Sequence, residues 1–328
     1  MFILGIDTSC DDTAASVVED GRKMLSNMVS SQNEIHEKYG GIVPEIASRK
    51  HIEMIWPVTK EALMKAGISL NDISAIAVCH GPGLIGSLLV GVCFAKSLAF
   101  SNNKPLVSVN HLEGHVFSSI LEEPVPEFPF IALVVSGGHT SLYRIDGFGK
   151  YTELGRTVDD AAGEAFDKVA KLLGLGYPGG PFIDALSQEG NSEAIYFPRA
   201  QLERVYDFSF SGLKTAVLTY LKKNQKFRKE DVAASFESAV IDVLISKSIR
   251  AAKEERIDKI VLSGGVSANS ALRVQLQDRA GKEKIKVYLP SPNLCTDNAA
   301  MIASAGFFHV QEENLAGFDL NPKAYLPL

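Results

Sequence analysis

The chain has 328 residues, a length that favours two domains. Hydrophobic residues make up 46% and charged residues 22%, the composition of an ordinary globular protein with enough apolar side chains for a core. The net charge of −6 does not favour a general nucleic-acid binder, and no apolar run is long enough to predict a membrane span.

The N-terminus and the cysteines indicate the compartment. Asp7 interrupts the first apolar run and no basic leader precedes it, so we expect a core strand there and not a signal peptide. The four cysteines form no Cys-x-x-Cys pair, which excludes a zinc ribbon or a thioredoxin-type motif. Scattered thiols fit a reducing environment, and we therefore expect a cytoplasmic protein.

Two stretches of the chain repeat one strand pattern. Strands are expected at 3–9, 14–18 and 23–31, and again at 130–136, 141–145 and 151–157. Each triplet is followed by a strand, a glycine turn and a helix, at 76–100 and at 259–277. We interpret the repeat as a duplicated α/β unit. The alternative is coincidence, because hairpins are common. No low-complexity linker separates the halves, which favours two lobes packed around a cleft.

Three turns follow apolar strands, the first two resembling phosphate turns and the third an adenosine-binding segment; glycines in such turns let backbone N–H groups approach anionic oxygens. They are Asp7-Thr8-Ser9-Cys10-Asp11, Ser136-Gly137-Gly138-His139-Thr140 and Ser263-Gly264-Gly265-Val266-Ser267-Ala268-Asn269. In this order they resemble the turns of the actin-like ATPase superfamily. The resemblance implies an α/β fold of two ribonuclease-H-like lobes with a nucleotide and metal cleft between them. The first lobe is expected at 1–128 plus 298–328, and the second, with a helical insert, at 129–297.

A second set of motifs narrows the family. It comprises His111-Leu112-Glu113-Gly114-His115, the segments 160–168, 177–181 and 208–215, and Thr296-Asp297-Asn298-Ala299-Ala300. From residue 3 to about 305 the series resembles the tRNA threonylcarbamoyltransferase family, once named glycoproteases. The resemblance implies transfer of the threonylcarbamoyl group from threonylcarbamoyl-AMP to N6 of the adenosine 3′ of the anticodon. The tRNAs concerned read A-starting codons.

A histidine pair is the candidate metal site. Histidines four apart on a helix share one face, so His111 and His115 can share a metal. The family resemblance points to Asp297 as the carboxylate ligand. Two imidazoles and a carboxylate suit one divalent metal per chain, with Fe²⁺ expected and Zn²⁺ as the alternative. The alternative to a metal site is a histidine pair that is structural or simply exposed. The alternative role of Asp297 is the N-cap of the following helix.

The position of Glu113 weighs against a metalloprotease. In HExxH proteases the glutamate directly follows the first histidine and serves as the base. Here Glu113 lies two residues from each histidine, on the opposite side of a helix. A thermolysin-like base is therefore missing if the segment is helical.

The resemblance also assigns contacts to the adenine nucleotide, which is threonylcarbamoyl-AMP or ATP, ADP or AMP. These residues are Val134, Val135, Ser136, Gly137, Gly138, Asp167, Gly180, Asp184 and Asn269. Ser9, His139, Gly264 and Gly265 are further candidates, and Asp11 is the candidate catalytic residue, as a proton acceptor. Each of three residues also has a local alternative role. Asp167 can form a surface ion pair with Lys171 on a helix, and Asp184 can be a solvated helix residue. Asn269 can cap its helix.

Five cations, Lys222, Lys223, Lys226, Arg228 and Lys229, are either a solvated helix end or a strip that binds tRNA phosphates. The resemblance implies two partners, a smaller paralogue of the same fold (TsaB-like) and a P-loop ATPase (TsaE-like), and no membrane. The donor is made by a separate threonylcarbamoyl-AMP synthase. Apolar helix faces in 50–70 are either the surface for the paralogue or ordinary core.

Three rival functions follow from the same residues. A small-molecule kinase or ATPase of the superfamily transfers phosphoryl groups with Mg²⁺ and has no use for His111 and His115. A metalloprotease is disfavoured by Glu113. A non-catalytic scaffold has no need of an open metal site.

Overall fold

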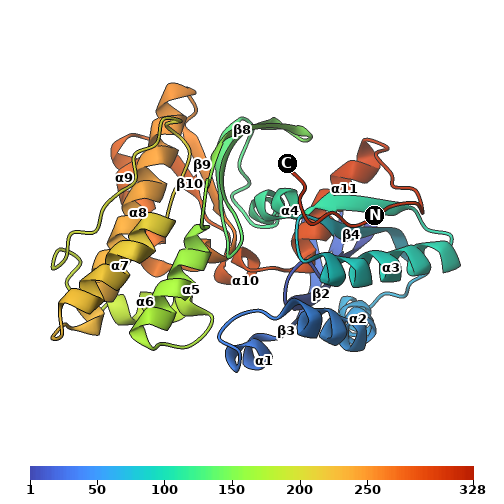
Figure 1. Cartoon of the computed structure of the whole chain (residues 1–328). Helices are drawn as coiled ribbons and strands as arrows, with labels where there is room; N and C mark the ends of the chain where they lie inside the picture. Colours follow the sequence, from blue (N-terminus) through green and yellow to red (C-terminus); the bar gives the residue numbers. More distant parts are fainter. The chain divides into compact units, whose positions relative to one another are not determined.

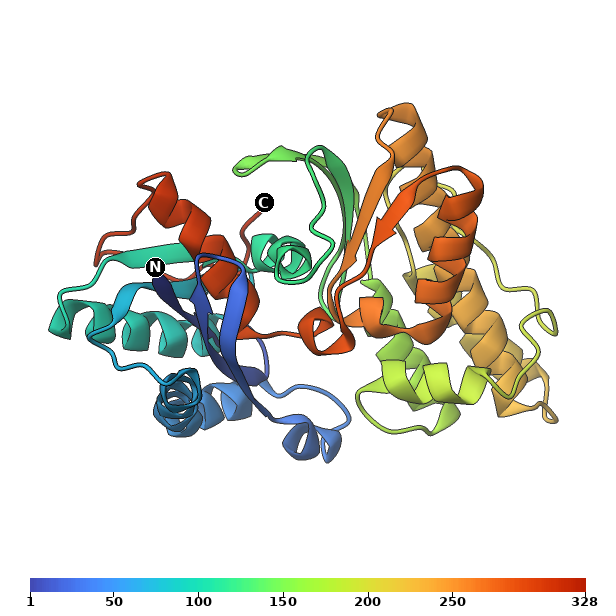
Figure 2. The same cartoon turned by 180° about the vertical axis from the view of Figure 1, so that it is seen from behind.

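The computed structural model describes all 328 residues, Met1–Leu328, and the chain divides into two compact units (Figures 1 and 2). Unit 1 comprises Met1–Val125 and Asp297–Leu328, and unit 2 comprises Pro126–Thr296. Each unit contains its own five-stranded sheet, as an α/β protein with two lobes requires. The exact lobe boundaries, expected after residues 128 and 297, stay a prediction.

The sheet of unit 1 has the strand order β3-β2-β1-β4-β5. Its strands are β1 (Phe2–Asp7), β2 (Asp12–Glu19), β3 (Lys23–Ser31), β4 (Ile73–Gly81) and β5 (Leu106–Asn110). The first three pair antiparallel, whereas β1, β4 and β5 run parallel. Parallel strands end at one edge of a sheet, so Asp7 at the end of β1 and His111 just after β5 share that edge.

The helices of unit 1 cover both faces of this sheet. They are α1 (Asn33–Glu37), α2 (Pro44–Ala66), α3 (Ile85–Ser101), α4 (His111–Phe117), the 3₁₀ turn η1 (Ser118–Ile120) and α11 (Ala299–Gln311). Alternation along β1 sends Leu4 and Ile6 into the core formed with α2 and α3, while Gly5 meets Ala299 and Ala303 of α11. The sheet is thus buried on both sides.

The sheet of unit 2 repeats the arrangement, with the strand order β10-β9-β6-β7-β8. Its strands are β6 (Phe130–Val135), β7 (Thr140–Gly147), β8 (Lys150–Arg156), β9 (Lys259–Ser263) and β10 (Lys286–Tyr288). Again three consecutive strands pair antiparallel and the later ones join parallel to the first. The repeated pattern expected from the sequence is confirmed.

The helices of unit 2 pack their apolar sides into one core with this sheet. They are α5 (Ala162–Leu173), α6 (Gly179–Ser187), α7 (Ser211–Lys223), α8 (Lys229–Glu254), the 3₁₀ turn η2 (Gly265–Ala268), α9 (Ser270–Lys282) and α10 (Pro292–Cys295). Phe166 of α5 and Phe236 of α8 meet edge to face, with ring centroids 5.3 Å apart. α8 contacts β9 and α9 contacts β10, and Figure 1 shows these helices beside the two strands.

One predicted boundary is wrong. The second strand is expected from residue 14, but β2 already begins at Asp12, which pairs with Ser31 of β3. Thr13 is buried and its hydroxyl lies 2.8 Å from Nδ1 of His51, so the side chain favours the strand. None of the helices combines the length and apolar character needed to cross a bilayer.

Candidate metal and nucleotide sites

The histidine pair lies on α4, a short helix whose residues are all buried. The helix begins where the side chain of Asn110 accepts a hydrogen bond from the N–H of Leu112, at 2.8 Å. The histidines are four positions apart, so both rings lie on one face, with centroids 4.6 Å apart. The helical geometry expected from the spacing is confirmed.

The carboxylate of Asp297 lies beside both rings. Its Oδ1 is 3.5 Å from Nε2 of His111 and 3.3 Å from Nε2 of His115. The next residue, Asn298, is the N-cap of α11, because its side chain accepts a hydrogen bond from the N–H of Met301 at 3.1 Å. The alternative role of Asp297 as that cap is therefore wrong.

Burial and charge set the protonation of these three groups. Burial lowers the pKa of His115 and keeps the ring neutral. Burial opposes charge on Asp297 too, but His111 and His115 hold the pKa of this carboxyl well below its usual range. Burial likewise opposes charge on His111, yet Asp297 and Asp7 raise its pKa well above the usual value. A divalent cation competes with that proton for the same lone pair.

The residues fit a divalent metal. Both ring nitrogens of His115 are fully buried and make no hydrogen bond, an arrangement that costs about 1–3 kcal/mol for each unsatisfied group. The ligand atoms of His111, His115 and Asp297 all lie within 4.8 Å of one another. Imidazole nitrogens and a carboxylate oxygen form the donor set of zinc and non-haem iron sites.

A second group, Asp7, Cys79 and His111, lies on the other side of the His111 ring. Nδ1 of His111 is 3.1 Å from Oγ of Ser9 and 3.4 Å from Oδ2 of Asp7. Burial raises the pKa of Cys79 to about 12, so this group stays a thiol, whereas thiolate is the form that binds metals. We therefore interpret the group as the support of His111. No local sequence pattern predicts that Asp7 and Cys79 lie beside His111, because their contact depends on strand order.

The acidic turn of unit 1 lies near Asp297. Asp11 is half-buried, and burial together with the charge of Asp297 raises its pKa. Burial and the same neighbour raise the pKa of Asp12 to about 7. His51 of α2 holds the turn, since its Nε2 lies 3.0 Å from the carbonyl oxygen of Cys10. Sequence patterns did not single out His51.

Glu113 does not belong to this cluster. It is buried, and its Oε2 lies 2.8 Å from Nε2 of His309 on α11. The carboxylate is thus committed to a helix–helix contact within unit 1. It cannot serve as the base of a thermolysin-like protease.

The glycine turn after β6 presents free backbone amides. The N–H of Ser136 donates to the carbonyl of His139 at 2.8 Å, and the N–H of His139 donates to Oγ of Ser136 at 3.2 Å. Gly137 and Gly138 between them are exposed, and a Cβ at either position would meet nothing within 4 Å. Their N–H groups enter neither bond of the turn and can face an anion.

Val134 and Val135, which the resemblance placed among the ligand contacts, are fully buried residues of β6. Their side chains belong to the core. Only their backbone groups can approach a ligand, and β6 pairs with β7 on one side and β9 on the other.

The two candidate ribose carboxylates hold helix starts in unit 2. Oδ1 of Asp167 accepts a hydrogen bond from the N–H of Gly179, at 2.7 Å, at the start of α6. Asp184 accepts from the N–H and the hydroxyl of Ser270, at 3.1 and 2.6 Å, at the start of α9. Asp184 is therefore no merely solvated residue. These contacts link α5 to the start of α6, and α6 to the start of α9.

Asn269 is the N-cap of α9, which confirms the helix-cap role expected as an alternative to a base contact. Its Oδ1 accepts from the N–H of Leu272 at 2.8 Å, and its Nδ2 donates to Oε1 of buried Glu237 at 2.6 Å. One N–H of the amide is left for a ligand. Gly180 and Gly265 border open space, whereas Gly264 has φ +88° and a Cβ there would collide with the carbonyl oxygen of Val135.

Known proteins resemble this chain along its length. The family model for TsaD, tRNA N6-adenosine threonylcarbamoyltransferase, matches residues 23–304. The chain belongs to this family. A tRNA N6-adenosine threonylcarbamoyltransferase from Thermodesulfovibrio yellowstonii is 59% identical to this chain, and the match covers 100% of both proteins. One from Clostridium perfringens is 54% identical over 100% of this chain and 98% of its own.

Solved structures outside the family share the fold. The HypF of T. kodakarensis superposes with a TM-score of 0.64 at 13% identity, over 95% of this chain and 48% of its own. A ROK hexokinase from Thermus thermophilus gives a TM-score of 0.51 at 15% identity, over 96% of this chain and 99% of its own. The fold class expected from the sequence is confirmed, and with the family the chain is a transferase.

Proposed function

We propose that this chain transfers the threonylcarbamoyl group from threonylcarbamoyl-AMP to N6 of the adenosine 3′ of the anticodon, in tRNAs that read A-starting codons. Family membership carries the reaction class. The observation that favours it over a kinase is the buried ring of His115, which makes no hydrogen bond and lies 3.3 Å from Asp297, beside His111. A phosphoryl transferase has no use for such a pair.

Each unit has its own role in this proposal. In unit 1, His111, His115 and Asp297 hold one divalent metal, Fe²⁺ or Zn²⁺, which when bound acts as a Lewis acid. In unit 2, the amides of Gly137 and Gly138 hold the phosphate of the adenylate. The units are the two lobes of the actin-like fold.

Ribose and base contacts are proposed for the remaining residues of unit 2. Asp167 and Asp184 accept ribose hydroxyls with the lone pairs that their helix-start bonds leave open. The second N–H of Asn269 faces the base, and Gly180 leaves space for the nucleotide. Ser136, His139, Gly264 and Gly265 shape the two turns.

The chemical step is an acyl transfer without a covalent enzyme intermediate. The N6 amine attacks the carbamoyl carbon, a C–N bond forms, and the bond from that carbon to the phosphate oxygen breaks. AMP leaves with the electron pair. We assign the proton lost from N6 to Asp11, whose raised pKa makes it a stronger base than an exposed aspartate.

Partners are proposed from the surface of unit 1 and from the resemblance. Ile52, Trp56 and Met64 on α2 are 66%, 49% and 70% exposed, unusual for large apolar side chains. They are a surface for the smaller, TsaB-like paralogue. A TsaE-like ATPase and a separate donor synthase complete the cytoplasmic system.

The test is transfer of radiolabelled threonine to an unmodified tRNA that reads A-starting codons. The donor synthase, bicarbonate, ATP and both partners are supplied, and wild type is compared with His111→Ala and Glu113→Gln. We expect label with wild type and Glu113→Gln and none with His111→Ala. Label that persists with His111→Ala removes the metal's role. No label with wild type, where a relative is active, favours the kinase.

A further inference from the structure

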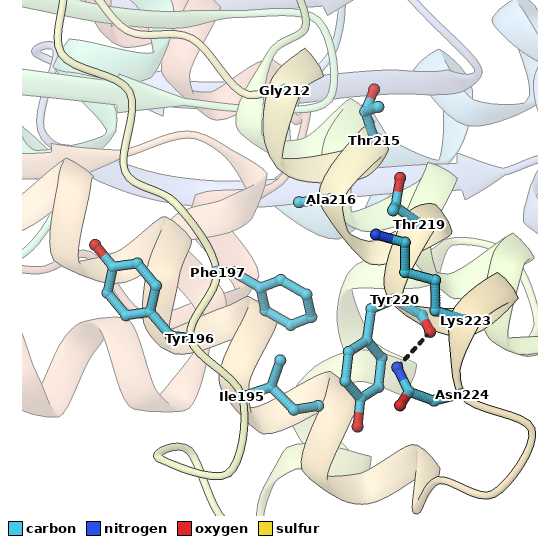
Figure 3. A pocket seen from close by; sticks show the side chains of 10 residues that line it. All are labelled: Ile195, Tyr196, Phe197, Gly212, Thr215, Ala216, Thr219, Tyr220, Lys223 and Asn224. Atoms are coloured by element: carbon cyan, nitrogen blue, oxygen red, sulfur yellow. Dashed lines mark hydrogen bonds between the residues drawn. The ribbon is translucent and has the colours of Figure 1, made fainter.

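A pocket of about 450 Å³ lies in unit 2 between α7 and the segment before it (Figure 3). Its lining includes Ile195, Phe197, Thr215, Tyr220, Lys223 and Asn224. In Figure 3 the rings of Phe197 and Tyr220 lie side by side, and their centroids are 6.1 Å apart in an edge-to-face contact. Phe197 is buried, whereas Tyr220 is partly exposed. The volume is within the range of small-ligand sites, roughly 300–1,000 Å³.

Beside this pocket the chain carries exposed cations without partners. Lys222, Lys223, Lys226 and Lys229 are exposed and form no ion pair. Arg228 donates to the carbonyl of Glu189 at 3.2 Å and has two long contacts with carboxylates, Glu230 at 3.6 Å and Asp231 at 3.8 Å. The net charge of the chain is −6, so an unpaired basic cluster is a local exception. It favours an anionic partner.

A second basic pocket of unit 2 shows the contrast. There three of the cations are neutralised by close carboxylates: Arg250 by Glu254 at 2.7 Å, Lys253 by Glu283 at 2.7 Å and Arg279 by Asp242 at 2.8 Å. Lys282 of that pocket is unpaired too, so what distinguishes the end of α7 is the density of unpaired lysines, four of them within residues 222–229.

Helix stability does not explain the cluster. Cations favour the C-terminal end of a helix, which accounts for Lys222 and Lys223 in the last turn of α7. Arg228 and Lys229, however, stand at the N-cap and the first position of α8, where the helix dipole opposes positive charge.

We infer that this surface binds a single-stranded segment of the tRNA, with one unstacked base in the pocket and its phosphates on the lysines. The partly exposed ring of Tyr220 can stack on any base, and neighbouring lysines bind the backbone. An acidic protein partner would use the lysines but has no need of a base-sized pocket. The inference rests on the proposed function for its ligand, and none of these residues belongs to the metal or glycine-turn groups.

The experiment measures binding of an unmodified tRNA transcript by the full chain at several salt concentrations, without donor. Lys223→Ala/Lys226→Ala removes two cations, and Ala216→Leu fills the pocket from α7. Lys282→Ala/Lys284→Ala removes two other exposed, unpaired lysines of unit 2 as the control. Thermal melting checks that every variant is folded.

For Lys223→Ala/Lys226→Ala we expect about five- to eightfold weaker binding per lysine at 0.1 M salt. The slope of log K against log salt should fall by about 0.7–0.9 per lysine. Ala216→Leu should weaken binding about tenfold with an unchanged slope, and the control should match wild type.

If the control variant loses as much tRNA affinity as the lysine variant, the inference is overturned, because the loss then reflects only the change in net charge. Unchanged binding by Ala216→Leu overturns it as well, since the base pocket is then unused. If the lysine variant binds tRNA normally but loses the ATPase partner, the surface is a protein interface. Wild type that binds tRNA but transfers nothing refutes the proposed function and leaves this inference standing.

Discussion

The ring of His111 lies with Nδ1 3.4 Å from Oδ2 of Asp7, a buried oxygen that makes no hydrogen bond. The other ring nitrogen, Nε2, faces Asp297. A proton on Nδ1, beside Asp7, leaves the Nε2 lone pair for a metal. A carboxylate that orients a metal-binding histidine in this way also raises its basicity.

Asp7→Asn should therefore weaken metal binding about 10- to 100-fold while the protein stays folded. The amide keeps an oxygen for the hydrogen bond from the N–H of Ser9, seen at 2.9 Å. Competition against a chromogenic chelator measures the affinity. Glu113→Gln, a buried carboxylate on α4 that faces His309, is the matched control. Equal affinity in Asp7→Asn and wild type would show that Asp7 has no such role.

Glu237 should make stability depend on pH. Burial raises its pKa from the usual 4.5 to about 7, with nearby Asp184 adding to the shift. The folded state prefers the protonated form, so this contribution is complete below pH 4.5 and is lost as the pH rises through about 7. The contacts of Ser187 agree with a protonated Glu237. The Ser187 hydroxyl lies 2.6 Å from both Glu237 and the carbonyl of Ile183, and it can donate its one proton to only one of them, so a protonated Glu237 can donate to it in turn.

Glu237→Gln mimics the protonated side chain and should be more stable than wild type at pH 8, by on the order of 2–3 kcal/mol, and equal to it near pH 4.5. Urea unfolding at both pH values measures the difference. Glu193→Gln, at an exposed residue without an ion pair, controls for loss of a carboxylate. A Glu237→Gln variant no more stable than wild type at pH 8 contradicts the expected burial penalty.

Local rules predicted what depends on local spacing. The histidines four apart fix a shared helix face, and an asparagine before an apolar helix predicts the cap at Asn269. Asp297 lies far along the chain and was reached only through the family resemblance. The contact of Asp7 with His111 depends on the parallel order of β1, β4 and β5, and no local pattern encodes that order.

Gly264→Ala should destabilise unit 2, because φ +88° is a conformation that L-residues rarely adopt and the new Cβ would collide with the carbonyl oxygen of Val135. Backbone strain alone predicts a loss of about 1–3 kcal/mol. Gly265→Ala, one residue on, meets open space and has no such φ, so it should unfold like wild type. Chemical denaturation of the pair measures the contrast, and similar midpoints would refute it.

Asp11→Asn should slow threonylcarbamoyl transfer about 10²- to 10⁴-fold, the usual contribution of a general base. Asparagine is nearly isosteric but cannot accept the proton from N6. Metal content should stay at the wild-type level, since Asp11 is not among the ligand atoms that lie within 4.8 Å of one another. Asp20→Asn, at an exposed aspartate bonded to the N-terminal amine, is the control. A variant that loses both metal and transfer would make Asp11 part of the metal site, and one that keeps transfer would leave the proton to water.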